Sequence, residues 1–413
     1  MFMNSMMFVV ALLCLSLVMP VNASSSQASA KRWRSKLSDS KSEETRSSLF
    51  DALNAQQWLK AARLADSAAG SQDSSLWQYQ AWAYSMLGRL DLVQEMEDRG
   101  LIPYLPPRCG QEPKVSDDDL VSKVAAMSRT TQVVILQELH AVVQHRLLLQ
   151  RLLPALYDSG YRYLAVEDFE ALPAASARSP RRPSGFHSSR EPVYGDAIST
   201  ALALGYTLIS YEAKFPPPAE VEPAHVQQWR DFQQAKNIRK RILMKNPQAR
   251  VLVFAGTNHG QEKVTGGYTP MGLRLRQETG IDPLSIDQTI CRLDKRSAAA
   301  MGAINDTGAR ESGYDLRVAL RRPRFVARRP DWLRSLGRVD VELRDEFRVK
   351  SQPLVVEARA LEESDGAPPI DRVYLADGET LPLLLPPGRF RVTVHSNRGS
   401  RSYVEVVGGG PTE

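Results

Sequence analysis

The chain has 413 residues, of which 43% are hydrophobic and 24% are charged, and its formal net charge is +6. This length is sufficient for two or three domains with a sizeable core. The composition is that of a globular protein, which excludes the fibrous and wholly disordered classes.

The N-terminal segment, residues 1–23, predicts a secretory signal peptide. Its apolar stretch Met7–Val18 is too short to span a bilayer comfortably, and small residues follow up to Ala23. We expect cleavage near Ala23, which gives an exported protein in the periplasm or outside the cell. Because no later segment is long and apolar enough, we expect no transmembrane helix.

Two cysteines, Cys109 and Cys291, remain after this cleavage. Two cysteines in an oxidising compartment can pair, but the sequence does not show whether their Cα atoms come close enough. The alternatives are therefore one disulfide bond or two unpaired, buried thiols.

The first part of the mature chain divides into two regions. Residues 24–46 are rich in Ser, Lys and Arg, which predicts a disordered linker. In residues 47–110, apolar side chains such as Trp77, Ala81 and Tyr84 recur at helical spacing. We expect a helical hairpin region there, packed on the main domain.

Residues 111–300 alternate strand patterns with helix patterns. The predicted strands are Val133–Leu136, Tyr163–Val166, Thr207–Ser210 and Val251–Ala255, and the predicted helices lie near Val142–Ser159, Gly195–Leu204 and Val226–Lys245. This alternation predicts an α/β domain with a central, mostly parallel sheet and flanking helices. The stretch Ala171–Pro192, rich in Pro, Ser and Arg, is either a lid over the strand ends or a surface insertion.

The last part of the chain predicts an Arg-rich connector and an accessory domain. Residues 301–338 carry a dense run of arginines, which either contacts an anionic surface or is a solvated connector with partly paired charges. We favour the connector, and we expect no nucleic acid partner because no aromatic stacking motif accompanies the arginines. Residues 339–413 alternate apolar and polar side chains between turns, which predicts a small antiparallel β-sandwich.

Polar side chains follow each of the four predicted strands of the α/β domain. Glu138 and His140 follow the first strand, and Glu167, Glu212 and His259 follow the other three. Residues two apart in a strand point to one face, and the carboxyl ends of parallel strands meet at one edge of the sheet. We therefore expect three carboxylates and two imidazoles to form one cluster, which must be paired, bind a metal ion or shift its pKa values.

The helix predicted near Val226–Lys245 adds two candidate residues. Arg230 and Asn237 are seven residues apart, which places them on one face of that helix. A guanidinium can bind a carboxylate through two parallel hydrogen bonds. Arg230 is therefore a candidate clamp, either for a substrate carboxylate or for the glutamates of the cluster.

These motifs together resemble a known superfamily. Glu138-Leu139-His140, with His145 and Gln150 after it, resembles the start of the haem-binding uptake (ChaN-like), Tiki and erythromycin-esterase superfamily. The strand before Glu167, the helix that carries Arg230 and the sequence Gly256-Thr257-Asn258-His259 fit the same pattern, over roughly residues 118–290. Members usually carry Gly where this chain has Gln137, whose side chain could crowd the site or alter the turn.

The resemblance implies an exported hydrolase that cleaves an ester or peptide bond in a small-molecule or peptide substrate. In a metal-assisted version, Mn, Zn or Fe would be bound by His140, Glu167, Glu212 and His259, with Glu138 as general base. In a metal-free version His140 would be the base. In both versions Arg230 would stabilise developing negative charge, and His259 would belong to the catalytic group.

Two alternatives remain open at this point. The first is a haem- or metal-binding uptake protein without turnover, in which His145 and Asn237 join His140 and His259 as cofactor-binding residues. The second is a scaffold, in which an inactive α/β domain lies between two interaction modules.

Overall fold

The computed structural model describes residues 40–71, 73–102, 109, 117–167, 190–214, 217–289, 291–297, 299–304, 311–348 and 352–408. The expected signal peptide lies outside these ranges, as does the expected lid apart from its last three residues. Within the described ranges, no helix combines the length and the apolar character that crossing a membrane requires.

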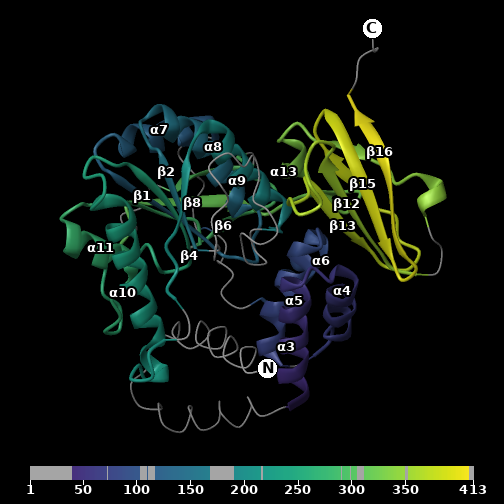
Figure 1. The fold of residues 1–413 in the computed structure, drawn as a ribbon, viewed down its shortest axis with the longest axis horizontal. Helices are drawn as coiled ribbons and strands as arrows, with labels where there is room; N and C mark the ends of the chain where they lie inside the picture. The colour runs from purple at the N-terminus through teal and green to yellow at the C-terminus, as the bar shows by residue number, and fades with distance from the viewer. Residues whose placement is uncertain are drawn as a thin grey trace.

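An eight-stranded sheet forms the centre of the structure, in the order β3-β2-β4-β1-β5-β8-β6, with β7 paired to β8 (Figure 1). Its strands are β1 (Val133–Glu138), β2 (Tyr163–Val166), β3 (Thr207–Ser210), β4 (Val251–Gly256), β5 (Leu284–Asp287), β6 (Arg292–Leu293), β7 (Met301–Ile304) and β8 (Leu316–Arg321). Neighbours in this order are parallel, and β7 runs antiparallel to β8. The predicted α/β class with a mostly parallel sheet is confirmed.

The sheet extends beyond the predicted end of the α/β domain at residue 300. Strands β7 and β8 lie within residues 301–338, for which the sequence predicts a connector. The side chains of Val318, Ala319 and Leu320 have no exposed surface, so this short apolar run is buried in the sheet despite the arginines around it.

Helices cover both faces of the sheet. On one face lie α7 (Asp117–Ser128), α8 (His145–Asp158) and α9 (Pro192–Leu204), and on the other lie α10 (Val226–Ile238), its π-helical extension η4 (Arg239–Leu243) and α11 (Met271–Thr279). Along β1, Val134 and Leu136 pack toward the first face, whereas Val133 and Ile135 pack toward the second. This alternation is the two-residue period of a strand buried on both sides.

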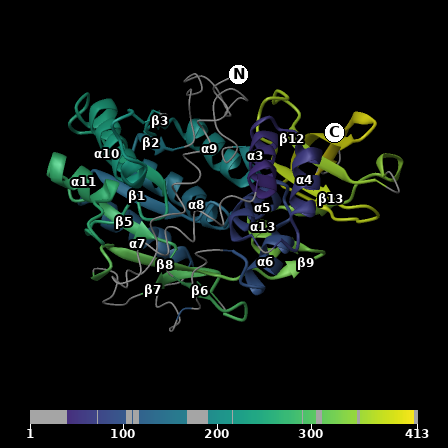
Figure 2. The same ribbon diagram turned by 90° about the horizontal axis from the view of Figure 1, so that it is seen from below.

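Four helices form the N-terminal region: α3 (Ser40–Asn54), α4 (Trp58–Ser67), α5 (Ser74–Met86) and α6 (Leu90–Asp98). Helix α3 begins inside the segment 24–46, for which the sequence predicts disorder. The apolar core of these helices also contains Ala141, from the loop after β1, and Val355 and Tyr374 from the C-terminal part. Helices α5 and α6 therefore lie between the sheet and the C-terminal strands (Figure 2).

The C-terminal part consists of two antiparallel sheets around a common apolar core, as the sandwich prediction requires. The larger has the order β13-β12-β15-β16 and the smaller pairs β11 with β14. Their bounds are β11 (Val339–Val341), β12 (Leu354–Ala360), β13 (Asp371–Leu375), β14 (Leu383–Leu385), β15 (Gly388–Ser396) and β16 (Gly399–Val407). The short elements β9 (Phe325–Val326), β10 (Arg329–Pro330) and α13 (Asp331–Arg334) connect them to the sheet, and η3 (Pro223–His225) and η5 (Asp345–Phe347) are single turns.

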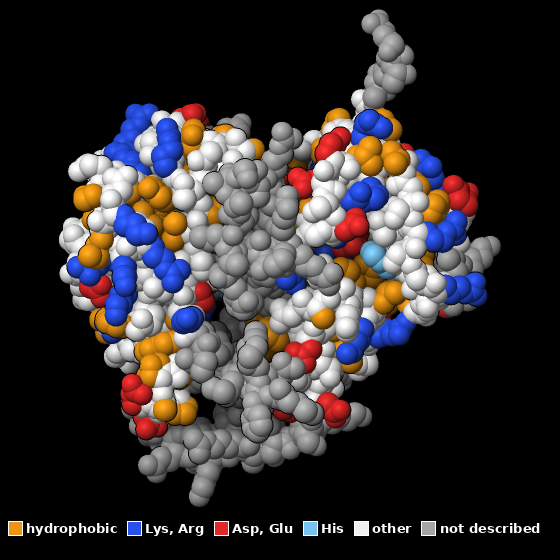
Figure 3. Space-filling model, in the orientation of Figure 1, with side chains coloured by type: hydrophobic (Ala, Val, Ile, Leu, Met, Phe, Trp, Pro, Cys, Tyr) orange, Lys and Arg blue, Asp and Glu red, His pale blue; other side chains and the backbone are white. Residues whose placement is uncertain are grey.

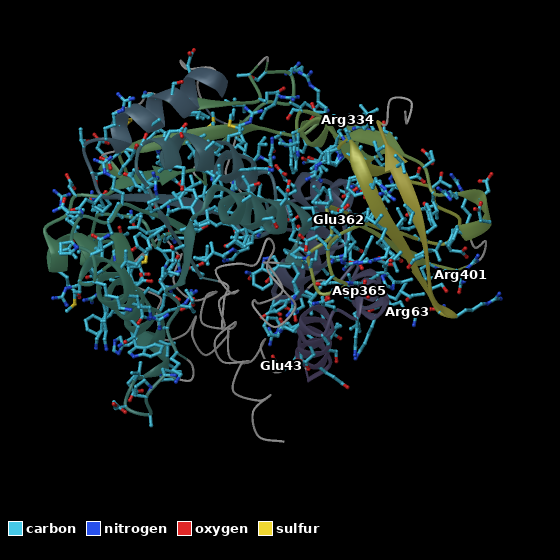
Figure 4. The ribbon with its side chains drawn as sticks, turned by 45° about the horizontal axis from the view of Figure 1, so that its top comes forward. Glu43, Arg63, Arg334, Glu362, Asp365 and Arg401 are labelled. Atoms are coloured by element: carbon cyan, nitrogen blue, oxygen red, sulfur yellow. A yellow bond between two sulfur atoms is a disulfide. The ribbon has the colours of Figure 1, made fainter. Side chains whose placement is uncertain are left out.

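Arginines of residues 317–338 join the three parts of the chain through ion pairs. Carboxylates pair with Arg321, Arg322, Arg328, Arg329, Arg334 and Arg338. Arg334 lies in α13, between the central sheet and the sandwich (Figure 4). Outside this stretch, Arg63 of α4 donates a hydrogen bond to the Asn397 side chain of the sandwich. On the face in Figure 3, Lys and Arg side chains are scattered rather than gathered over one element. Paired arginines of this kind stabilise the junction, and they do not favour contact with an anionic surface.

A disulfide bond joins Cys109 to Cys291, which resolves the alternative that the sequence left open. The two cysteines are 182 residues apart, and their Cα atoms are 4.9 Å apart. The backbone N–H of Cys109 also donates to the carbonyl oxygen of Arg292 in β6. The disulfide therefore fastens the chain at Cys109, after the helical region, to the residue before the edge strand β6.

We expect the double substitution Cys109→Ser, Cys291→Ser to lower the free energy of unfolding by about 2–4 kcal/mol, because a cross-link that closes a long loop restricts the unfolded chain. Guanidinium denaturation of the oxidised protein measures this loss. A reductant should destabilise the wild-type protein by a similar amount and leave the double variant unchanged. A reductant effect that persists in the double variant would contradict the assignment.

Candidate functional site

The side chains predicted to cluster do lie together at the carboxyl edge of the sheet. His140 Nδ1 is 2.7 Å from Glu138 Oε1, and His140 Nε2 is 4.0 Å from Glu167 Oε2. His259 Nε2 is 3.4 Å from the other oxygen of Glu167, and Arg230 joins Glu167 to Glu212. Four strand ends thus meet around Glu167.

Glu138 is a buried carboxylate that is held by a buried arginine. Arg146 of α8 donates from Nε to Glu138 Oε2 at 2.9 Å and from Nη2 to Oε1 at 3.1 Å. Its Nη1 binds Glu191, which caps the N-terminus of α9. Burial acts to raise the pKa of Glu138, but Arg146 and His140 outweigh it and hold that pKa well below its ordinary value. Glu138 is therefore charged at neutral pH.

His140 is oriented by this carboxylate and remains accessible. Its side chain is 36% exposed, whereas that of Glu138 is 2% exposed. In the neutral imidazole, Nδ1–H donates a hydrogen bond to Glu138, and Nε2 then carries no proton. Gly256, at the end of β4, lies beneath this nitrogen, and a Cβ there would come within 3.1 Å of His140 Nε2. A glycine at this position keeps the space beside the imidazole open.

A second carboxylate–imidazole pair lies on the other side of Glu167. His259 Nδ1 binds the fully buried Asp231, which also accepts hydrogen bonds from the Tyr268 hydroxyl and the Met271 backbone N–H. Asn258 has φ 72°, a left-handed conformation that Asn tolerates, and this turn follows β4 directly. Burial lowers the pKa of His259, but Asp231 and Glu167 outweigh burial and raise that pKa.

Glu167 stands between the two imidazoles. It accepts a hydrogen bond from the Gly256 backbone N–H at 3.0 Å, and Gln234 donates to it at 3.2 Å. Burial acts to raise its pKa, but His259, Arg230 and His140 together lower it. The central carboxylate is thus negative, and it is held by the Arg230 guanidinium and by two N–H donors.

Arg230 is bound mainly to Glu212. Its Nε lies 3.0 and 3.1 Å from the two oxygens of Glu212, its Nη2 also binds that carboxylate, and its Nη1 lies 3.1 Å from His259 Nε2. Gln234 Nε2 bridges Glu212 and Glu167. Arg230 therefore clamps the glutamates of the cluster, which is one of the two roles that the sequence left open.

Two residues expected to bind a cofactor have structural contacts instead. His145 has no exposed surface, its Nδ1 accepts the Leu139 backbone N–H, and burial lowers its pKa to about 3. Asn237 donates to the carbonyl oxygens of Tyr211 and Glu212, both at 3.0 Å. Both residues therefore bind backbone groups, His145 after β1 and Asn237 after β3.

Gln137 does not crowd the site. Its side chain accepts the Gly260 backbone N–H at 2.8 Å, and a Cβ on Gly260 would come within 2.7 Å of Ile135 Cγ2. Gln137 thus shares the face of Ile135, whereas Glu138 points to the opposite face. The replacement of the glycine expected from the superfamily leaves the Glu138–His140 pair undisturbed.

Several residues of the site were not predicted from the sequence as site residues. They are Trp82, Arg146, Glu191, Asp231, Gln234 and Tyr268. A signal for Arg146 existed, because it is a charged residue directly before the apolar run Leu147-Leu148-Leu149. Glu191 before Pro192 is also a helix-start signal. Trp82 gave no such signal.

The expected metal ligands do not form a ligand set. No group of three or more His, Cys, Asp or Glu side chains within the described ranges has an arrangement that could hold a metal ion. Glu212 is directed at Arg230, and the Arg230 guanidinium lies between Glu212 and His259. A permanent cation thus occupies the position that a divalent ion would need, and we derive no step through a metal.

Comparison with known proteins gives little further information. No family model and no curated protein matches the chain. It is similar to a solved structure described as the type III effector HopBA1, with 14% identity and a TM-score of 0.34, over 53% of this chain and 98% of that one. A second solved structure, described as bacterial protein toxins, has 13% identity and a TM-score of 0.32, over 59% of this chain and 57% of that one. The C-terminal region of Pasteurella multocida toxin, described as having a thiol-protease like catalytic triad, has 11% identity and a TM-score of 0.28, over 89% and 54%. These TM-scores are too low to support an argument.

We expect Arg146→Met to lower the free energy of unfolding at pH 7 by roughly 3–5 kcal/mol, because it leaves Glu138 buried without its cation. The pKa of Glu138 is depressed, so the ion pair stabilises the protein above about pH 4.5, the ordinary pKa of Glu. That stability is lost as the pH falls through the depressed pKa. Chemical denaturation from pH 7 down to pH 3 should show the difference between wild type and variant shrinking. A constant difference would contradict this account.

We expect Asp231→Asn to lower the pKa of the His259 imidazole, because Asp231 is the strongest of the charges that raise it. An NMR titration of the histidine ring protons measures the pKa of His259 in the wild type and in the variant. An unchanged titration of His259 would show that Asp231 does not set its charge.

Proposed function

We propose that the protein is an exported hydrolase of the haem-binding uptake/Tiki superfamily that cleaves ester or peptide bonds. The order of the motifs from Glu138 to His259 along the chain supports the superfamily assignment. The fold class is compatible with it, because the motifs lie at the carboxyl ends of parallel strands, where open α/β sheets place their ligand sites. The N-terminal sequence supports export.

One observation carries the proposal: a buried, charged carboxylate orients an accessible imidazole. Glu138 binds His140 Nδ1 at 2.7 Å, and His140 keeps 36% of its side chain exposed. A carboxylate in this position fixes the imidazole tautomer and stabilises the imidazolium that forms when Nε2 takes a proton. His140 is therefore the general base of the proposed reaction, and Glu138 is its positioning residue.

The proposed reaction needs no group beyond these side chains and water. His140 Nε2 takes a proton from a water molecule while the water oxygen forms a bond to the carbonyl carbon. The cationic Arg230, with His259 beside it, stabilises the negative charge on the carbonyl oxygen. His140 then returns the proton to the leaving oxygen or nitrogen as its bond to the carbonyl carbon breaks.

The contacts of the cluster favour the metal-free version of the hydrolase. Arg230 and Gln234 already bind Glu212 and Glu167, which the metal-assisted version would use as ligands. In the uptake alternative, His145 would have to face the cofactor, and it is fully buried. Hydrolysis by imidazole catalysis is therefore the function that this geometry supports best.

We expect His140→Ala and Glu138→Gln to reduce kcat/KM on short 4-nitrophenyl esters on the order of 10²- to 10⁴-fold, the usual contribution of a general base. His140 is accessible, so His140→Ala should fold, and a thermal melt of each variant checks this. His225→Ala is the matched control, since His225 is exposed on η3 and should have no role.

Dialysis against a chelator separates the two versions of the mechanism. The metal-free version predicts that activity survives, whereas loss of activity that Mn²⁺ or Zn²⁺ restores would establish the metal-assisted version. Wild-type protein without hydrolytic activity, or a fully active His140→Ala variant, would refute the proposed function.

A further inference from the structure

The N-terminal helical region brings a tryptophan to the candidate active site. Trp82 of α5 lies beside His140, with ring centroids 6.2 Å apart and an interplanar angle of 70°. Fifty-eight positions of sequence separate the two residues, and they belong to different parts of the fold. The aromatic contact therefore depends on how the helical region packs against the sheet.

The position of Trp82 is fixed by its surroundings. The Ser85 hydroxyl, one turn further along α5, donates to the carbonyl oxygen of Ala141 at 2.9 Å. Ala141 follows His140 directly and is buried in the apolar core of the helices. Tyr79 also packs against Trp82, with ring centroids 5.3 Å apart. These contacts hold α5 against the loop that carries His140 and Ala141.

Trp82 and His140 are both partly exposed, in contrast to the residues around them. Ala81 and Ala83, next to Trp82 in α5, have no exposed surface. His140 Nε2 also lies 4.0 Å from Glu167 of the charged cluster. The accessible imidazole therefore has both an aromatic neighbour and a charged neighbour. Ligand sites commonly combine an apolar aromatic wall with a few placed polar groups.

We propose that Trp82 forms an aromatic subsite, and that the substrate carries an aromatic group next to its scissile carbonyl. This inference rests on the proposed function, because His140 would act on that carbonyl. A flat ring bound beside Trp82 buries apolar area and places the carbonyl near His140 Nε2. The polar cluster near His140 then stabilises the negative charge on the carbonyl oxygen, and Trp82 favours substrates that carry an aromatic ring.

The test compares methyl phenylacetate with methyl acetate, whose leaving groups are identical, by titrating the released acid in a pH-stat. Wild type should prefer methyl phenylacetate, and Trp82→Ala should reduce this preference in kcat/KM roughly tenfold, the scale of one lost aromatic contact with its buried area. Trp82→Phe should retain most of the preference. Trp77→Ala is the control, because Trp77 lies on the same helix and binds the carbonyl oxygen of Ser71 instead.

The outcomes separate a subsite from a structural role. If Trp82 only positioned His140, Trp82→Ala would slow both esters equally, and this result would overturn the inference. A wild-type enzyme without preference between the two esters would also overturn it.

Direct binding tests the subsite even if the proposed function fails. The products phenylacetate and acetate are titrated calorimetrically into wild type and Trp82→Ala. Tighter binding of phenylacetate to the wild type, lost in the variant, would support the subsite in a protein that hydrolyses neither ester. Equal binding of both acids to the wild type would exclude it.

Discussion

The buried ion pair between Glu138 and Arg146 is the interaction on which the candidate site depends. A carboxylate so deeply buried would take up a proton unless a cation compensated for its lost hydration. Arg146 provides this compensation and also binds Glu191, so a single guanidinium joins the ends of β1, α8 and α9. Because Glu138 stays charged, it can accept a hydrogen bond from His140 Nδ1–H, and Nε2 then carries no proton and can act as a base in the proposed reaction.

A second arginine, Arg230, orients the other side chains of the cluster. The planar guanidinium of Arg230 has fixed donor directions and a permanent charge, so it orients Glu212 and approaches Glu167 and His259 together. His259 and Arg230 lower the pKa of Glu167, whereas Asp231 and Glu167 raise the pKa of His259 against the effect of Arg230. In the proposed hydrolysis, the guanidinium would stabilise a developing oxyanion and the accessible imidazole would activate water.

Strand periodicity made the sheet and the cluster predictable from the sequence. Apolar runs followed by Glu138, Glu167, Glu212 and the His259 turn identify strands whose ends share an edge, and the contacts around Glu167 agree with that expectation. The same two-residue period places Gln137 on the opposite face from Glu138, which answers the question whether its side chain crowds the site. Strand β8 was not predicted, because the arginines on both sides of its apolar residues conceal a strand that is buried in the sheet.

Contacts between distant parts of the chain were beyond sequence reasoning, and they determine what surrounds the accessible imidazole. Helical periodicity does not distinguish Trp82 of α5 from the core residue Trp58 of α4, because their difference lies in what packs against each of them. Trp58 stacks under the buried Arg372 at 3.7 Å, whereas Trp82 reaches His140. Ala141 belongs to the core of the helices, so the loop after β1 packs against them. The candidate site therefore depends on contacts between distant parts of the chain, and the helical region contributes to it.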